Sequence, residues 1–398
     1  MPPQNLRIPG PTPLPDAVRE AGSRQMVAHR GPEFKALVAR VSEGLRPAFR
    51  TSSDVMILTA SGTGGLEAAI VSFLSPGDAV LSISIGVFGD RFATIATTYG
   101  ADVTKPDIEW GQGADPELVR ESIRDMVSDG HPPKAVLFTF NETSTGVTNP
   151  LKRLATVVQD EAPEALIIVD AISGLGAMPF EMDAWGLDVV ITGSQKAWMI
   201  PPGLAMAAVS DRGWSAAEHA TMPRFYFDLG RHRDALPKGQ TPWTPAVSLF
   251  FQLEAALVLI EAEGYEGIFA RHAACAATAR AGIKALGLRP FADAAHASNS
   301  VTSVHLPDGA DWSLLNKELL ARGLVLAGGQ ATLSGKIFRI GHLGDVRVGD
   351  IVRAIEVLED AAVAAGIDVN RDVGAAAARR AGEEHSPVRD TVSAPTGA

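Results

Sequence analysis

Three residue patterns are scarce in this sequence, and each scarcity excludes a class of protein. The 398 residues include one cysteine, which rules out an internal disulfide or a cysteine-rich metal site. Lys and Arg number 35 against 46 Asp and Glu, so the chain lacks the basic surplus that nucleic-acid binding needs. No apolar run approaches the roughly 20 residues that span a bilayer, and the N-terminus has no signal-peptide pattern. We expect a cytoplasmic protein without metal, nucleic-acid or membrane partners.

The single cysteine, Cys275, falls in the helix-like stretch "RHAACAATARAGIKAL". A small thiol in such a pattern is more often buried than reactive, because a reactive thiolate needs an electropositive and accessible setting. We therefore interpret Cys275 as a core residue.

Apolar residues are plentiful, at 46% of the chain, and they are arranged in short runs separated by helix-length segments. This alternation predicts an α/β fold with a mostly parallel sheet covered by helices. The expected strands lie at residues 55–60, 79–84, 134–140, 165–170, 189–193 and 204–210.

The pattern changes after residue 264 to shorter alternating elements. We expect residues 1–15 to form an N-terminal arm, 16–264 a large domain and 265–367 a smaller C-terminal α/β domain. Residues 368–398 show little apolar periodicity, which is typical of a mobile tail.

Three chemical candidates stand at the ends of expected strands. Glycines at 62, 64 and 65 lead from a strand into a helix, which indicates either a phosphate cradle or a tight turn. Asp170 ends an apolar strand. It could bind a ligand at the carboxyl ends of the strands, or it could cap the next element. Lys196 lies between a strand and a Pro-Pro-Gly turn. Together an amine, a carboxylate and an anion cradle could hold pyridoxal 5'-phosphate through a Schiff base, a ring-nitrogen partner and phosphate donors.

A flat side chain is also needed to stack on the cofactor ring. Phe88 follows another expected strand, in a glycine-rich turn. Its ring could serve this purpose or belong to the core.

Seven segments carry a resemblance to a known family. They are "IPGPTPLP", "SGTGGLEAA", "GVFGDRF", "NETSTGV", "VDAISGLGAMPFEMDAWGLDVVITGSQKAWMIPPGLA", "TPWTPAVSL" and "KIFRIGHLG". In order and spacing they resemble fold-type I, class V aminotransferases, most of all the alanine-glyoxylate and serine-glyoxylate group. The resemblance spans residues 5 to about 365 and is most specific over 169–205.

The resemblance implies a role for individual residues. It makes Lys196 the Schiff-base lysine and proton shuttle, and Asp170 the partner of the pyridine nitrogen. Phe88 takes the stacking position, where eukaryotic members usually have tryptophan. The remaining matches are cofactor-binding Gly62, Thr63, Thr143 and Gln195, substrate-binding Gly10 and Arg339, and Gln240, Thr241 and Thr244, which are candidates to reach the cofactor phosphate of a second subunit. A homodimer with active sites at the interface is therefore expected.

The implied reaction is a ping-pong transamination from a small L-amino acid, serine or alanine, to glyoxylate. Arg339 would bind the α-carboxylate, and no second arginine stands at a matched position to pair with a side-chain carboxylate. Aspartate, phosphoserine and 2-aminoethylphosphonate remain alternative donors, with His29, Arg30 and His342 as candidate anion-binding groups.

Two other classes are weaker alternatives. A cysteine desulfurase needs a cysteine on a mobile loop and a histidine against the ring, whereas this chain offers Cys275 in an expected helix and Phe88. A non-catalytic protein with this fold is disfavoured because every matched chemical residue is present.

Overall fold

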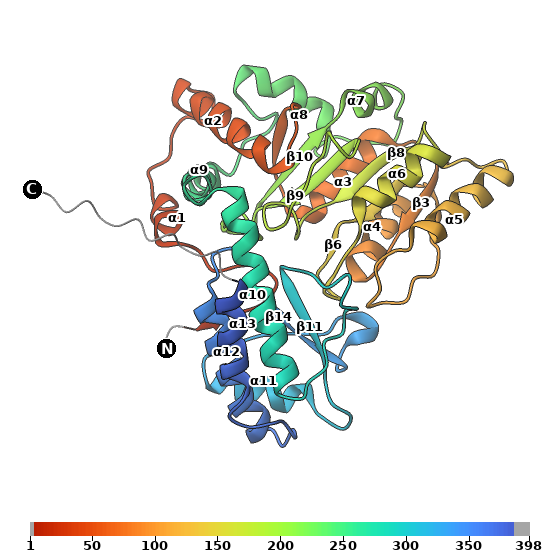
Figure 1. Cartoon of the computed structure of the whole chain (residues 1–398). Coiled ribbons are helices and arrows are strands. Elements are labelled where there is room, and N and C mark those ends of the chain that lie inside the picture. The colour runs from red at the N-terminus through yellow and green to blue at the C-terminus, as the bar shows by residue number, and fades with distance from the viewer. Residues whose placement is uncertain (1–3, 386–398) are drawn as a thin grey trace, which may run out of the picture.

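The computed structural model describes residues 4–385 and has two parts, linked by the long helix α10 (Tyr265–Ala285) (Figure 1). Gly264 separates α9 (Val247–Glu263) from α10, with a φ of 74° that favours glycine. Helix α10 thus begins at the residue where we place the start of the smaller domain.

The first part is built on a seven-stranded sheet in which only β10 runs antiparallel to its neighbours. The order across the sheet is β2 (Val55–Thr59), β10 (Leu204–Val209), β9 (Val189–Gly193), β8 (Leu166–Asp170), β5 (Ala135–Thr139), β3 (Ala79–Ile83) and β4 (Asp102–Thr104). The inner strands are buried on both faces, as their uninterrupted apolar sequences predict. The mostly parallel α/β sheet expected from the sequence is confirmed.

Helices cover both faces of this sheet and form a separate apolar core with each. One face packs against α3 (Gly62–Phe73), α4 (Val87–Thr98), α7 (Asp211–Ala217) and α8 (Leu229–Ala235). The other packs against α2 (Pro32–Phe49), α5 (Pro116–Ser128), α6 (Leu151–Glu161) and α9. Asp115 begins α5 by accepting a hydrogen bond from the backbone N–H of Glu117, with Pro116 in the first turn.

The second part has its own antiparallel sheet and apolar core. The sheet has the order β11 (Val301–His305), β14 (Ile337–Gly341) and β13 (Ala327–Gly328), and α10, α11 (Trp312–Ala321) and α12 (Val348–Ala364) pack on it. Smaller elements are β1 (Asn5–Leu6), α1 (Asp16–Ala21), the hairpin β6 (Asn141–Glu142) and β7 (Val147–Thr148), β12 (Leu324–Val325), and the short 3-10 helices at Leu236–Lys238 and Ala331–Leu333.

The N-terminal arm crosses from one part to the other. Strand β1 pairs in parallel with β12 of the second part, and the chain then returns to α1 beside α9 (Figure 1). The segment between them, residues 7–15, therefore runs along the junction of the two parts.

The expectation of a mobile tail over 368–398 is wrong for residues 374–385. They form helix α13 (Gly374–His385), which packs against α10 and α12. Its buried face consists of Gly374, Ala378 and Gly382, spaced by four residues, so the stripe lacks the large apolar side chains that reveal a helix in a sequence. Residues 386–398 of the expected tail lie outside the described residues.

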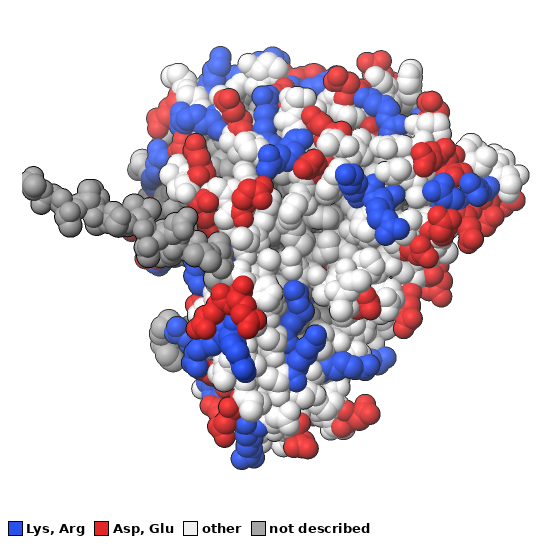
Figure 2. Space-filling view, in the orientation of Figure 1, with Lys and Arg blue, Asp and Glu red and all other residues white. Residues whose placement is uncertain are grey.

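On the surface, Lys and Arg are interspersed with Asp and Glu, and the middle of the face in Figure 2 carries few charges. That face shows no extended basic area. Among residues 4–385, no helix is both long and apolar enough to cross a bilayer.

Candidate active site

One cavity of about 200 Å³ brings together most of the predicted site residues. It lies beside the carboxyl ends of β8 and β9, where ligands bind in open α/β sheets. Predicted residues that line it are Gly10, Gly62, Thr63, Phe88, Thr143, Asp170, Gln195 and Lys196. Its other lining residues are Ser61, Leu66, Arg91, Asn141, Ile172 and Ser173.

Lys196 follows β9 and is 8% exposed. Its Nζ donates a hydrogen bond to the carbonyl of Pro9, and its own carbonyl accepts one from the Thr12 hydroxyl at 3.1 Å. Burial lowers the pKa of the Lys196 amine to about 8, although the nearby Asp170 acts in the opposite direction. A larger share of this amine is neutral near pH 7 than for a surface lysine.

Gly10 is placed beside this amine by the N-terminal arm. Its φ is 119°, and a Cβ there would lie 2.7 Å from Lys196 Nζ. Both the backbone conformation and the close approach exclude a larger residue.

Asp170 ends β8 and is 3% exposed. Its Oδ1 accepts a hydrogen bond of 2.9 Å from the backbone N–H of Ile172, which is the contact expected of a cap. Burial, with a smaller effect of the Glu142 carboxylate, raises the pKa of Asp170 to about 7. Asp170 therefore both caps its turn and presents a carboxyl group whose charge depends on what binds beside it.

The glycine-rich turn begins α3, and its residues Ser61, Gly62 and Thr63 line the cavity at the helix end whose N–H groups lack intrahelical partners. A Cβ on Gly62 would lie 2.5 Å from Ile172 Cδ1, and one on Gly65 would lie 2.7 Å from Ile191 Cγ2. These glycines let the helix approach the sheet closely, so the turn is tight and also offers an anion site.

Gln195 is the cavity residue with an unpaired acceptor. Its amide Oε1 is buried and has no hydrogen-bond partner among the described residues. Such an atom is costly to leave unpaired, so a ligand donor in the cavity would satisfy it.

Phe88 lies in the first turn of α4 rather than in a turn before it. It is partly buried and lines the cavity. The guanidinium carbon of Arg91 lies 4.7 Å from the centre of its ring, the distance of a cation–π contact.

Glu142, on β6, is a fully buried carboxylate that we did not predict. Its Oε2 accepts hydrogen bonds of 3.0 Å from the backbone N–H groups of Phe88 and Gly89. Its Oε1 accepts from the N–H and hydroxyl of Ser144, at 2.9 and 2.7 Å. Burial raises the pKa of Glu142, and the hydrogen bonds oppose this. The residue joins the β6–β7 hairpin to the helix that carries Phe88.

Arg339, on β14, reaches the same hairpin from the second part of the molecule. Its Nη1 donates to the Thr143 carbonyl at 3.0 Å, and its Nε donates to the Gly328 carbonyl at 2.9 Å. It is 5% exposed and burial lowers its pKa to about 10. Arg339 lies behind Thr143 rather than on the cavity wall.

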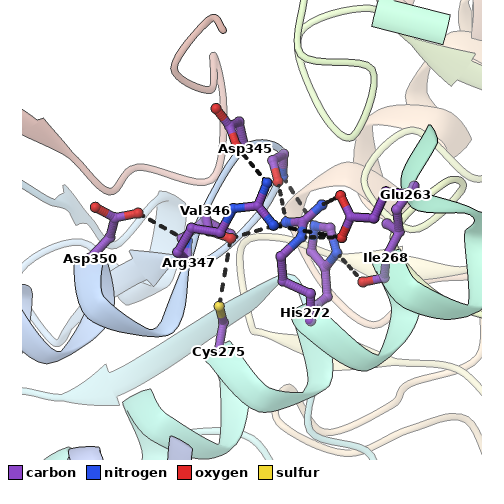
Figure 3. A network of polar contacts seen from close by, with 10 residues as sticks. Glu263, Ile268, His272, Cys275, Asp345, Val346, Arg347 and Asp350 are labelled. Atoms are coloured by element: carbon purple, nitrogen blue, oxygen red, sulfur yellow. Dashed lines mark hydrogen bonds and ion pairs between the residues drawn. The ribbon is translucent and has the colours of Figure 1, made fainter. Parts of the chain in front are cut away.

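The loop that follows Arg339 is held by a polar network at the junction of the two parts (Figure 3). Arg271 of α10 pairs with both oxygens of Glu263, at 2.6 and 3.0 Å. Its Nη1 donates to the carbonyls of Gly344 and Val346 at 2.8 and 3.0 Å. The arginine therefore ties the loop to the α9–α10 corner.

His272 supports the same loop from the next position of α10 (Figure 3). Its Nε2 accepts from the N–H of Gly344 at 3.2 Å, while its Nδ1 lies 2.8 Å from the Ile268 carbonyl. Burial lowers the pKa of His272 to about 3, so the ring is neutral, as this bonding requires. A Cβ on Gly344 would lie 2.9 Å from the hydroxyl of Thr12, which itself bonds to Lys196.

Several candidates lie away from the cavity. Arg30 Nη1 donates to Gln240 Oε1 at 2.7 Å and to the Thr241 carbonyl at 3.0 Å, and Thr244 is exposed nearby in the sequence. His342 is buried and bonds to Thr302 and Asn299. None of these residues, nor His29, lines the cavity of its own chain.

Cys275 lies buried within α10, as expected, and burial raises its thiol pKa to about 12. Such a thiol is not a nucleophile.

Comparison with known proteins identifies the class. The family model for "Aminotransferase class-V" matches residues 12–354. Serine–glyoxylate aminotransferase of Methylorubrum extorquens is 35% identical over 382 residues, covering 94% of each chain. L-aspartate–glyoxylate aminotransferase of Paracoccus denitrificans is 35% identical over 375 residues, with the same coverage. A Synechococcus protein named "Soluble hydrogenase, small subunit" is 44% identical over 358 residues, or 89% of this chain and 91% of that one.

A solved structure agrees with this assignment. Ureidoglycine-glyoxylate aminotransferase of Bacillus subtilis superposes with a TM-score of 0.89 at 31% identity, covering 96% of this chain and 99% of that one. The fold is that of a fold-type I transferase. The chain belongs to the class-V aminotransferase family, and it is an aminotransferase.

Proposed function

We propose that the chain binds pyridoxal 5'-phosphate and moves the amino group of serine or alanine to glyoxylate. The observation that carries the proposal is the convergence of Lys196, Asp170 and the first turn of α3 on one cavity. Each residue alone has an ordinary structural interpretation, but the three together match the aldehyde, ring nitrogen and phosphate of one cofactor.

The cavity's residues fit this cofactor in their chemistry. The N–H groups at the start of α3 suit a phosphate, and the unpaired amide oxygen of Gln195 offers an acceptor. Phe88 offers a flat face, and the carboxyl group of Asp170 offers a partner for a protonated pyridine nitrogen. Bound there, the cofactor would act as an electron sink for the electron pair left at the substrate's Cα.

The chain's own residues then have distinct tasks. Neutral Lys196 Nζ is able to bond to the cofactor aldehyde and, once released, to take the proton from Cα. A positively charged ring nitrogen would favour the ionised form of Asp170. The Asp170 carboxylate would in turn keep that nitrogen protonated. The described hydrogen bonds of Arg339 use Nε and Nη1, which leaves Nη2 for a substrate carboxylate.

The choice of a neutral donor is supported by the charges around the cavity. His29, Arg30 and His342 do not line the cavity of their own chain, so within one chain they offer nothing to a phosphonate or a second carboxylate. Arg91 does line it, and it could serve aspartate unless it has another task. Relatives are named for serine and for aspartate at equal identity, so the donor has to be measured.

The test compares kcat/KM for serine, alanine, aspartate and 2-aminoethylphosphonate, each with glyoxylate and with pyruvate. We expect serine or alanine with glyoxylate to exceed aspartate by at least about tenfold, because a buried unpaired carboxylate costs well over 1.4 kcal/mol. A preference for aspartate or the phosphonate would contradict the donor proposal while leaving the aminotransferase class intact.

The hydrogenase name of one relative gains no support from these residues. Iron–sulfur clusters are held by several cysteine thiolates. This chain has one cysteine, buried in α10.

We also propose a homodimer in which Gln240, Thr241 or Thr244 reaches the partner's cofactor phosphate. These residues stand apart from the cavity of their own chain. Next to them Phe225 and Tyr226, 66% and 41% exposed, stack on Trp243 with ring centres 4.9 and 5.8 Å away. An exposed aromatic group of this kind is typical of an interface.

A further inference from the structure

Arg91 is a cavity residue to which neither the sequence patterns nor the proposed reaction gives a task. It lies on α4 one turn after Phe88, so both side chains project from the same face of the helix. Its Nη1 lies 3.5 Å from the Thr63 hydroxyl, and its guanidinium carbon lies over the Phe88 ring.

The charge of Arg91 has no counter-ion among residues 4–385. No carboxylate of the described residues forms an ion pair with it, and the adjacent Asp90 is instead bonded to Lys105 at 2.7 Å. The positive charge of Arg91 lowers the pKa of Asp170, so this charge acts on a group inside the cavity. A partly buried cation that lacks a carboxylate partner gains most from an anionic ligand.

The position of Arg91 indicates which anionic group it would bind. Its hydrogen-bond partner Thr63 belongs to the first turn of α3, whereas Arg339 contacts the β6–β7 hairpin through Thr143. Arg91 therefore lines the cavity near the start of α3, whereas Arg339 lies behind the hairpin, on the other side of Thr143. A helix terminus supplies roughly half a unit charge, which is far less than a phosphate dianion carries.

We propose that Arg91 is a cofactor-anchoring residue whose guanidinium binds the 5'-phosphate at the start of α3, with Thr63 positioning it. This inference rests on the proposed function. It also removes Arg91 from the groups available to a dicarboxylic donor, because one guanidinium cannot be committed to both anions.

The test measures equilibrium binding to cofactor-free protein by quenching of tryptophan fluorescence. Pyridoxal 5'-phosphate and pyridoxal, which lacks the phosphate, are titrated into the wild type, Arg91→Gln, Arg91→Lys and the control Lys105→Gln. Lys105 is a matched cation because it bonds to Asp90, the neighbour of Arg91 on α4. Thermal unfolding verifies that each variant is folded.

We expect Arg91→Gln to weaken binding of the phosphorylated form by tenfold or more, about the value of a charge-assisted contact, and to leave pyridoxal binding unchanged. Arg91→Lys should be intermediate, since an ammonium keeps the charge without the planar fork. Lys105→Gln should match the wild type. An equal loss for both ligands would overturn the proposal and show that Arg91 only supports Phe88, and no loss for either would also overturn it.

Two further arms separate this inference from the proposed function. Inorganic phosphate should raise the unfolding temperature of the wild type more than that of Arg91→Gln, a result that needs no cofactor chemistry. Failure of the wild type to bind pyridoxal 5'-phosphate at all would contradict the proposed function itself. A change confined to KM for aspartate would assign Arg91 to the substrate and overturn the anchoring role.

Discussion

The two ionisable residues at the centre of the cavity are both shifted toward their neutral forms. Burial lowers the pKa of Lys196 to about 8 and raises that of Asp170 to about 7. Near pH 7, about one Lys196 amine in ten is therefore neutral, whereas an ordinary lysine is almost wholly charged. The fold thus makes the amine available for bonding to an aldehyde without a separate base.

This shift predicts how cofactor-free protein recombines with pyridoxal 5'-phosphate. Only the neutral amine reacts, so the second-order rate should rise with pH and level off above about 8, as followed by absorbance. The Asp170 carboxylate raises the pKa of Lys196, so Asp170→Asn should move the profile to lower pH. Lys196→Ala should give no borohydride-reducible adduct. A profile that keeps rising toward pH 10 would show that the amine is not desolvated.

At the scale of elements, the β6–β7 hairpin connects the first turn of α4, which carries Phe88, to Arg339 of the second part. Glu142 holds the first turn of α4, and the Thr143 carbonyl receives Arg339. Glu142 is the acceptor in all four of its hydrogen bonds. Glutamine would place an NH2 group against at least one backbone N–H.

We therefore expect Glu142→Gln to cost about 1–3 kcal/mol of unfolding free energy, the penalty of a buried unsatisfied donor. In the cofactor-free variant, the backbone amides of Phe88 and Gly89 should exchange hydrogen faster than in the cofactor-free wild type, as measured by mass spectrometry. Glu67→Gln is the matched control, because Glu67 accepts from the Tyr99 hydroxyl at 2.5 Å outside this hairpin. Unchanged exchange at Phe88 and Gly89 would show that Glu142 does not hold the first turn of α4.

The central strands could be predicted because buried parallel strands require uninterrupted apolar runs, as in β8 and β9. The residues at their ends, Asp170 and Lys196, could be predicted with them. Glu142 could not, because the backbone N–H groups of Phe88 and Gly89 that it holds lie 54 and 53 residues away in the sequence. Arg91 could not, because its partner Thr63 lies on another helix. The spacing of Arg91 from Phe88 was the one usable signal. Helix α13 was missed because its buried stripe is made of glycine and alanine.

At the scale of the whole molecule, the site depends on both parts and on the arm between them. Gly10 and Thr12 come from the arm, and Arg339 comes from the second part. Arg271 and His272 hold the loop after β14 against Thr12. Relative movement of the two parts would therefore move Arg339 with respect to Lys196, and the network limits that movement.

The largest assembly we predict is the homodimer. The exposed aromatic group adjoins the start of α3, since the Tyr226 hydroxyl donates to the Thr59 carbonyl at 3.4 Å. Phe225→Glu places a charge in this group and should shift the protein toward monomer in sedimentation. Leu314→Glu, at a 50% exposed residue of α11, is the control and should remain dimeric.

Monomer formation should loosen the cofactor, because the phosphate would lose its contacts from the partner's 240–244 segment. Pyridoxal 5'-phosphate affinity should fall in Phe225→Glu, while pyridoxal affinity should change little. Dilution of the wild type below its dimer dissociation constant should have the same effect. A monomeric Phe225→Glu protein with wild-type affinity for the phosphorylated cofactor would show that one chain completes the site alone, and that Arg91 and α3 suffice to hold the phosphate.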